Sequence, residues 1–196
     1  MNTITIQDNF IDDKHYEELT SLHIEYNKVH WIGALAKPQN ALHKLVLKTR
    51  PDIPSATDKL KPPYSYTGAT AWYNIRPIHP QWHNDIDSYC TKNGITYTPQ
   101  DKPPYTYLYY VKEPSKGGEL QLETGDLIIP KLNRLVYFPC SLIHRVRMYT
   151  GNRVSIGIIW WFDIPSELYG VLGEKETKVL DRLWEIEDER KIIKKG

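Results

Sequence analysis

The chain has 196 residues, of which 40% are hydrophobic and 25% are charged. That length supports one domain with a substantial core. Its 25 Lys and Arg against 24 Asp and Glu leave a formal net charge of +1, which disfavours a protein that binds polyanions mainly through its overall charge.

The N-terminal third, residues 1–65, is predicted to be a helical support for the rest. Residues 6–11 are typical of a short strand, and an acidic pair then follows as a helix cap. Over residues 15–30, apolar side chains recur at steps of three and four, which indicates an amphipathic helix. Four prolines within residues 51–63 predict an irregular connector.

Residues 66–162 change to short runs rich in Tyr, Val, Ile and Trp, separated by Pro, Gly and Asn. Many short strands with almost no helix between them predict a mainly β, antiparallel sandwich or barrel. Residues 88–104 show no periodicity and contain three prolines, so we expect a long loop there. The expected strands are residues 70–76, 105–112, 119–123, 126–129, 134–138, 144–149 and 153–162.

Residues 166–196 are again predicted to be helical, with an apolar face that includes Leu183 and Trp184 among charged neighbours. Such a helix either caps the sheet or pairs with a second copy, so monomer and homodimer both stay open. The sequence shows no internal repeat. We expect residues 1–196 to form one domain, with helices on both sides of a central β structure.

Neither secretion nor membrane insertion is expected. The longest strongly apolar run, residues 154–162, has about half of the ~20 residues that a membrane helix needs, and residues 1–5 are polar and mixed. The two cysteines, Cys90 and Cys140, are too few for a zinc quartet. We therefore expect two reduced thiols in the cytoplasm, with a single disulfide as the alternative.

One short motif indicates a metal site. His83 and Asp85 project to the same side of an extended segment, because side chains alternate along it. A third ligand has to come from distant sequence, and the strand predicted to begin at His144 supplies one. Two histidines and a carboxylate on one face of a metal leave three positions open, which is the geometry of non-heme Fe(II) oxygenases. In an extended segment Asp87 would project to the same side as His83 and Asp85, so it is an alternative carboxylate ligand for the metal.

An arginine at the start of the most apolar strand indicates an anion site. Burying Arg153 there costs free energy unless an anion pairs with it, and its planar fork suits a carboxylate. Ser155 faces the same way and adds a hydrogen-bonding group. The alternative, which weighs about evenly, is a buried salt bridge from Arg153 to Glu119 or Glu123.

Residues 66–162 resemble the catalytic domain of prolyl-hydroxylase-type 2-oxoglutarate/Fe(II) oxygenases, because five separated motifs agree with it in order and spacing. The motifs are His83-Asn84-Asp85, Gly117-Gly118-Glu119-Leu120, Arg134-Leu135-Val136-Tyr137-Phe138, His144-Arg145-Val146 and Arg153-Val154-Ser155-Ile156. The Asp8-Asn9-Phe10-Ile11 start is also similar to the entry of that family.

The resemblance implies a double-stranded β-helix, or jelly roll, with iron near its open end. It implies that His83, Asp85 and His144 bind Fe(II), and that Arg153 with Ser155 holds the distal carboxylate of 2-oxoglutarate. Such enzymes use O2 to hydroxylate an unactivated C–H bond while 2-oxoglutarate becomes succinate and CO2. Ascorbate is a further candidate cofactor.

Two tyrosines match positions that face the active site in this family. Tyr110 matches a tyrosine that hydrogen-bonds the same carboxylate of 2-oxoglutarate, and Tyr73 matches another that faces the site. The alternative is that each tyrosine packs in the barrel core with its hydroxyl at the rim. This alternative is a serious one, because the chain has fourteen tyrosines.

The chain also departs from the family pattern. Arg145 and Arg147 follow the distal histidine, where the family often has an acidic or neutral residue. Strand parity predicts that both point outward, because His144 and Val146 take the other face. The loop of residues 88–104 is longer than in compact relatives, and it would cover the iron and influence the choice of substrate.

The resemblance points to a prolyl residue in a peptide or protein as substrate, with a small metabolite as the alternative. A nucleic-acid demethylase of the same superfamily is a second interpretation, although the near-zero net charge makes nucleic acid unlikely. A non-catalytic, cupin-like binding protein is the rival from another class. In such a protein, His83, Asp85, His144 and Arg153 would not converge.

Overall fold

The structure is a computed structural model that describes residues 4–23, 29–33, 36–50, 68–75, 81–85 and 105–161. All of them belong to the compact unit Met1–Asp163; a second unit comprises Ile164–Gly196. The predicted connector at 51–63, the loop at 88–104 and the helix at 166–196 therefore lie outside the described residues. The single-domain organisation of residues 1–196 stays a prediction.

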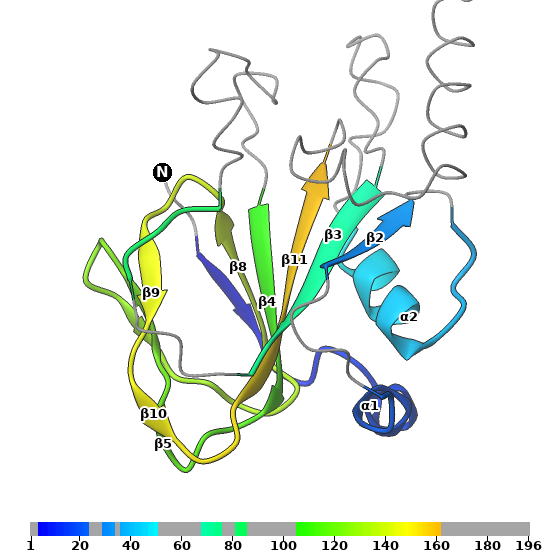
Figure 1. The fold of residues 1–196 in the computed structure, drawn as a ribbon, viewed down its shortest axis with the longest axis horizontal. Helices are drawn as coiled ribbons and strands as arrows, with labels where there is room; N and C mark the ends of the chain where they lie inside the picture. Colours follow the sequence, from blue (N-terminus) through cyan, green and yellow to red (C-terminus); the bar gives the residue numbers. More distant parts are fainter. Residues whose placement is uncertain are drawn as a thin grey trace, which may run out of the picture. The chain divides into compact units, whose positions relative to one another are not determined.

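The larger β layer is a six-stranded sheet in which every neighbouring pair is antiparallel (Figure 1). Its long central strand is β11, which is buried along its whole length. In spatial order the strands are β1 (Thr5–Gln7), β8 (Leu135–Pro139), β4 (Tyr105–Lys112), β11 (Val154–Trp161), β3 (Gly68–Asn74) and β2 (Val29–Gly33).

A smaller three-stranded sheet completes the jelly roll and carries the strand that begins at His144. Its order is β7 (Leu127–Ile128), β6 (Leu120–Leu122) and β9 (His144–Val146), and β5 (Lys116–Gly117) pairs with β10 (Tyr149–Thr150) in a separate two-stranded ribbon. Apolar residues of both sheets, among them Leu108 and Leu120, form one buried cluster. The predicted mainly β, jelly-roll fold is confirmed.

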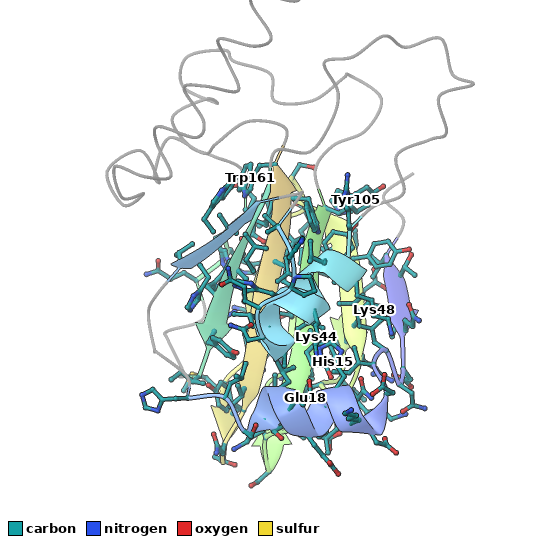
Figure 2. All side chains as sticks on the ribbon, turned by 90° about the vertical axis from the view of Figure 1, so that its right-hand side faces the viewer. His15, Glu18, Lys44, Lys48, Tyr105 and Trp161 are labelled. Carbon is teal, nitrogen blue, oxygen red and sulfur yellow. The ribbon has the colours of Figure 1, made fainter. Side chains whose placement is uncertain are left out.

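Two short helices, α1 (Asp13–Thr20) and α2 (Ala41–Lys48), lie against the large sheet (Figure 2). Each begins at a side-chain cap: Asp12 accepts a hydrogen bond from the His15 backbone and Asn40 from the His43 backbone. Leu19 of α1 and Leu45 of α2 belong to the core that the large sheet shares with the helices.

The helix predicted over 15–30 is wrong at its C-terminal end, where residues 29 and 30 lie in a strand; residues 24–28 lie outside the described residues. The helix ends at Thr20, where the hydroxyls of Thr20 and Ser21 bond to backbone carbonyls of the last turn and compete with its continuation. His30 instead lies in β2, which pairs residue by residue with β3. Backbone pairing with a distant strand overrides the local helical periodicity there. No described helix has the length and apolarity of a membrane span.

Alternation along each central strand divides the interior into two cores. On β4, Tyr109 and Val111 belong to the core shared with the helices, whereas Leu108 and Tyr110 belong to the core shared with the small sheet. Burial on both faces explains why β11 is apolar almost throughout. The functional site lies on the side of the sheet that carries Tyr110.

Candidate active site

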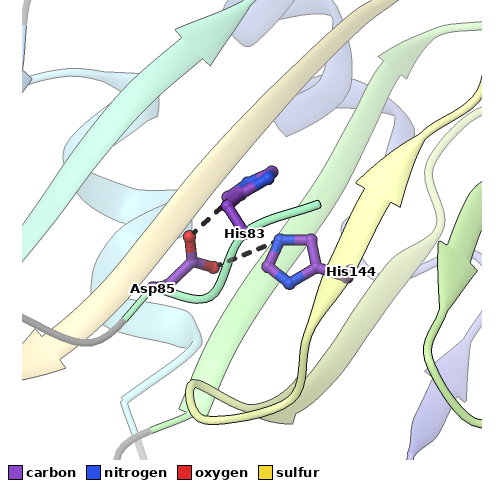
Figure 3. Close-up of side chains that lie close together, drawn as sticks. All are labelled: His83, Asp85 and His144. Atoms are coloured by element: carbon purple, nitrogen blue, oxygen red, sulfur yellow. Dashed lines mark ion pairs between the residues drawn. The ribbon is translucent and has the colours of Figure 1, made fainter. Parts of the chain in front are cut away.

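Three potential metal ligands converge between the two sheets. Ligand atoms of His83, Asp85 and His144 all lie within 4.8 Å of one another (Figure 3). The Nε2 atom of His83 is 3.9 Å from Oδ1 of Asp85, and the Nε2 atom of His144 is 3.5 Å from Oδ2. The spacing that suggested this triad in the sequence therefore brings the three side chains together.

Backbone hydrogen bonds hold these ligands in place. His83 and His144 form an isolated antiparallel bridge, in which each backbone N–H donates to the other's carbonyl, at 3.0 and 2.8 Å. Two residues on, the N–H of Asp85 donates to the carbonyl of Cys140 at 3.0 Å. The segment 81–85 is thus attached beside β9, and its alternation turns His83 and Asp85 to the same point.

The imidazole orientations suit metal binding. Nδ1 of His83 is 2.9 Å from the carbonyl of Gln81, and Nδ1 of His144 is 3.0 Å from that of Leu142. A carbonyl can only accept, so each Nδ1 carries a proton, and in the neutral ring this leaves the lone pair of Nε2 for a metal. Burial lowers the pKa of His144 and favours the neutral, ligating form, while the nearby Asp85 carboxylate opposes that shift.

Two neutral imidazoles and a carboxylate on one side are a donor set that fits Fe(II) and leaves positions for other ligands. The rival carboxylate, Asp87, lies outside the described residues. Among the described residues, His83, Asp85 and His144 supply three protein ligands.

A buried arginine forms the second part of the site. Arg153 is 2% exposed, and its Nη1 donates to the Ser155 hydroxyl at 3.0 Å. Its guanidinium carbon lies 5.2 Å from the ring centre of Tyr110 and 5.8 Å from that of Tyr149. Among the described residues, Nε and Nη2 of Arg153 and the buried hydroxyls of both tyrosines have no hydrogen-bond partner.

The alternative of a salt bridge from Arg153 to Glu119 or Glu123 is wrong. Glu119 is instead 3.9 Å from Arg147, and Glu123 accepts a hydrogen bond from the Ile143 backbone. A buried cation with unused donors is costly to keep without an anion. The donor cluster of Arg153, Ser155, Tyr110 and Tyr149 therefore fits a carboxylate.

One cavity of about 500 Å³ joins the two parts of the site. His83, Asp85 and His144 line it together with Arg153 and Tyr149. A molecule that bound the metal at one end could therefore present a carboxylate to the arginine at the other. The remaining walls are partly apolar and include Trp72, Leu108, Leu120, Phe138 and Val146.

The prediction for Tyr73 is wrong. Tyr73 pairs with Ile156 across β3 and β11 and packs in the core beneath the helices, where burial raises its pKa to about 12. Its neighbours Trp72 and Asn74 line the cavity instead. The alternation of side chains correctly assigned the residues of this strand to two opposite faces. It could not show which of the two faces lines the cavity.

Tyr149 is the site residue that sequence analysis missed. It lies in the two-residue strand β10 and contacts Arg153 through its ring. The two arginines that follow the distal histidine differ from each other. The Arg145 guanidinium lies over the Trp82 ring at 4.5 Å and donates to Gln121, whereas Arg147 lines the cavity, contrary to the expected outward orientation.

Comparison with known proteins supports the interpretation of the His83–Asp85–His144 triad as an Fe(II) site. Residues 73–162 match the model of the 2OG-Fe(II) oxygenase superfamily, and they include the triad and all four members of the donor cluster. No curated protein sequence matches the chain.

Two solved structures share the fold at 17% identity. One is the viral collagen prolyl hydroxylase of Paramecium Bursaria Chlorella virus-1, with a TM-score of 0.52 over 81% of this chain and 89% of that one. The other is a prolyl hydroxylase from Trichoplax adhaerens in complex with a hypoxia inducible factor peptide, with a TM-score of 0.50 over 89% of each chain. Residues 73–162 are thus similar to the 2OG-Fe(II) oxygenase superfamily, and the fold is one that these prolyl hydroxylases share.

Proposed function

We propose that the chain is a 2-oxoglutarate- and Fe(II)-dependent dioxygenase of the prolyl-hydroxylase type, and that it hydroxylates a prolyl residue in a peptide or protein. The observation that carries the proposal is the single cavity shared by the His83–Asp85–His144 triad and the Arg153 guanidinium, two of whose nitrogens have no hydrogen-bond partner among the described residues. The fold likeness to two prolyl hydroxylases, one of them bound to a peptide, supports the substrate class. The partly apolar wall beside the triad suits the uncharged ring of a prolyl residue.

The residues divide the work as follows. His83, Asp85 and His144 would hold Fe(II), which when bound supplies the oxidising chemistry with O2 and 2-oxoglutarate. Arg153 and Ser155 bind and orient the far carboxylate of 2-oxoglutarate, with hydrogen bonds from Tyr110 and Tyr149. Because these donors are buried and fixed, they align the cosubstrate with the triad and keep water out of that end of the cavity.

The nucleic-acid demethylase remains the second candidate within the superfamily, and the charges near the cavity favour it less. Arg147 lines the cavity but lies near the Glu119 carboxylate, and Arg145 packs on Trp82 outside the residues that line it. A binding protein without catalysis has no need of three convergent ligands and a buried carboxylate receptor, so the geometry favours the enzyme over the cupin-like alternative.

Succinate release from 2-oxoglutarate tests the proposal without a known substrate, on protein loaded with Fe(II) under anaerobic conditions and then exposed to O2. We expect turnover by the wild type, none by His83→Ala, and turnover by Arg153→Ala only at high 2-oxoglutarate. His23→Ala, an exposed histidine after α1, is the matched control and should behave as the wild type. Absence of both turnover and 2-oxoglutarate binding in the wild type contradicts the enzyme assignment.

The substrate class needs a second measurement. Proline-rich peptides should raise the rate of succinate release and gain 16 mass units at proline, whereas methylated oligonucleotides should do neither. Stimulation by the oligonucleotides with loss of their methyl groups would transfer the proposal to the demethylase.

A further inference from the structure

Thr106, which is not one of the three metal ligands, contacts the carboxylate of Asp85. Its hydroxyl donates to Oδ2 of Asp85 at 2.7 Å. Thr106 is 3% exposed and lies in the middle of the large sheet, paired with Phe138 on β8 and with Ile159 on β11. A β-branched side chain on a central strand has little rotational freedom, so its hydroxyl is a fixed donor.

The direction of that hydrogen bond follows from the neighbouring atoms. The Thr106 oxygen also lies 3.3 Å from the sulfur of Cys140, a buried free thiol. A hydroxyl has one proton, and the shorter contact is to a carboxylate, which is the stronger acceptor. The proton therefore points to Asp85, and the thiol can donate to the same threonine oxygen.

Asp85 is thus held from two sides. Its backbone N–H is bound to the Cys140 carbonyl, and its carboxylate is bound to the Thr106 hydroxyl. The backbone bond places the residue, but it leaves the side-chain torsions of Asp85 undetermined. Only the threonine, among the hydrogen bonds described for Asp85, fixes the plane of the carboxylate relative to the two imidazoles.

We propose that Thr106 is a positioning residue for the metal: its hydroxyl holds the Asp85 carboxylate in the metal-binding orientation and thereby raises the affinity of the site for divalent cations. The inference rests on the metal site of the proposed function. Hydrogen bonds to ligating groups restrict those groups before the metal arrives, and their loss typically lowers metal affinity by roughly 10- to 100-fold.

Three variants separate this role from general stabilisation. Thr106→Val keeps the shape and removes the hydroxyl, and Thr106→Ser keeps the hydroxyl. Thr70→Val is the matched control, because Thr70 is a buried threonine of β3 whose hydroxyl accepts a hydrogen bond from Trp161 rather than from a ligand. Each protein is compared by thermal unfolding without metal, which reports any loss of packing separately.

The measurement is the affinity for Mn²⁺ alone, by calorimetry or by the electron paramagnetic resonance of free Mn²⁺, with the visible spectrum of the Co²⁺-loaded protein as a second readout. We expect Thr106→Val to raise the dissociation constant by roughly 10- to 100-fold and to alter the Co²⁺ spectrum, while Thr106→Ser and Thr70→Val stay within about threefold of the wild type.

Equal Mn²⁺ affinity of Thr106→Val and the wild type would overturn the role of Thr106 and leave the proposed function intact. A wild type that binds no Mn²⁺ would overturn both. If Thr106→Val fails to fold, the comparison moves to Thr106→Ala against Thr106→Ser. Equal affinity of those two proteins contradicts the proposal, and a weaker Thr106→Ala supports it.

Discussion

Arg153 and Tyr110 form a buried pair whose polar atoms are only partly used. The guanidinium carbon is 5.2 Å from the ring centre, yet the Tyr110 hydroxyl and two guanidinium nitrogens have no hydrogen-bond partner among the described residues. Burial raises the pKa of Tyr110, and the positive charge of Arg153 opposes that rise. The phenol therefore stays protonated and can donate beside a permanent cation, as a carboxylate ligand requires.

Binding of 2-oxoglutarate should therefore stabilise the protein through Arg153. In Mn²⁺-loaded wild type, 2-oxoglutarate at about 100 times its dissociation constant should add about 2.7 kcal/mol to the free energy of unfolding. Arg153→Met should show no such gain at the same concentration. Without ligand, Arg153→Met should be at least as stable as the wild type, because an apolar side chain replaces an unpaired buried charge.

Thermal unfolding with and without 2-oxoglutarate measures both effects. Arg145→Met is the control, because Arg145 contacts Trp82 and Gln121 outside the cavity. An equal 2-oxoglutarate shift in Arg153→Met and in the wild type would show that the carboxylate binds elsewhere.

Tyr149, which only the structure revealed, should matter as much as Tyr110 for cosubstrate affinity. Tyr149→Phe and Tyr110→Phe each remove one donor to a carboxylate, and each should weaken 2-oxoglutarate binding by about tenfold, or about 1.4 kcal/mol. Calorimetric titration measures the change. Tyr109→Phe, whose hydroxyl bonds to Asn133 in the other core, should lower stability by about 1 kcal/mol without changing 2-oxoglutarate affinity.

The stability of the metal-free protein should fall as the solution becomes acid, in part through His144. Burial places the pKa of His144 in the folded state below its usual value of about 6.5. As the pH drops below 6.5, the unfolded chain takes up the proton first. The contribution of His144 is therefore fully present above that pH and is lost as the pH falls toward the folded pKa.

Urea unfolding between pH 7.5 and 5, in the presence of a chelator, tests this dependence. His144→Gln should lose less stability over that range than the wild type. Parallel curves for the two proteins would show that His144 titrates alike in the folded and unfolded states. Mn²⁺ affinity should also fall in acid, since only neutral imidazoles bind metal.

Gly157 should tolerate no side chain because Trp72 lies across it. A Cβ at this position would clash with two indole carbons of Trp72, a residue that lines the cavity. Gly157→Ala should therefore destabilise the protein by about 1–3 kcal/mol and displace the indole. Gly33→Ala, on β2 with open space around the same position, is the control. Denaturant unfolding and tryptophan fluorescence report the two effects, and matching results for the two variants would contradict this contact.

The metal triad and Arg153 were predictable because short-range alternation and motif order carry their geometry. The pair His83 and Asp85 depends only on alternation, and the strand at 105–112 was predicted with its observed bounds. The helix at Ala41–Lys48 was missed although its signal is present, with Asn40 as a cap and apolar residues at helical spacing.

Other features depend on contacts that no local pattern specifies. The register of β3 against β11 decides which face of the sheet Tyr73 occupies. This pairing joins segments that are more than 80 residues apart in sequence. Tyr149 reaches Arg153 because β10 pairs with β5, and nothing in the sequence distinguishes it from the other tyrosines. The placement of His30 in β2 rather than in a helix depends on pairing with the distant strand β3.

The backbone attachment of residues 81–85 sets which changes of sequence this site can absorb during evolution. The bonds from His83 to His144 and from Asp85 to Cys140 use main-chain atoms, which almost any residue supplies. Substitution at position 84 leaves those bonds available. A single inserted or deleted residue between His83 and Asp85 would instead turn one ligand to the opposite side. The site is thus tolerant of replacement and intolerant of any change in length.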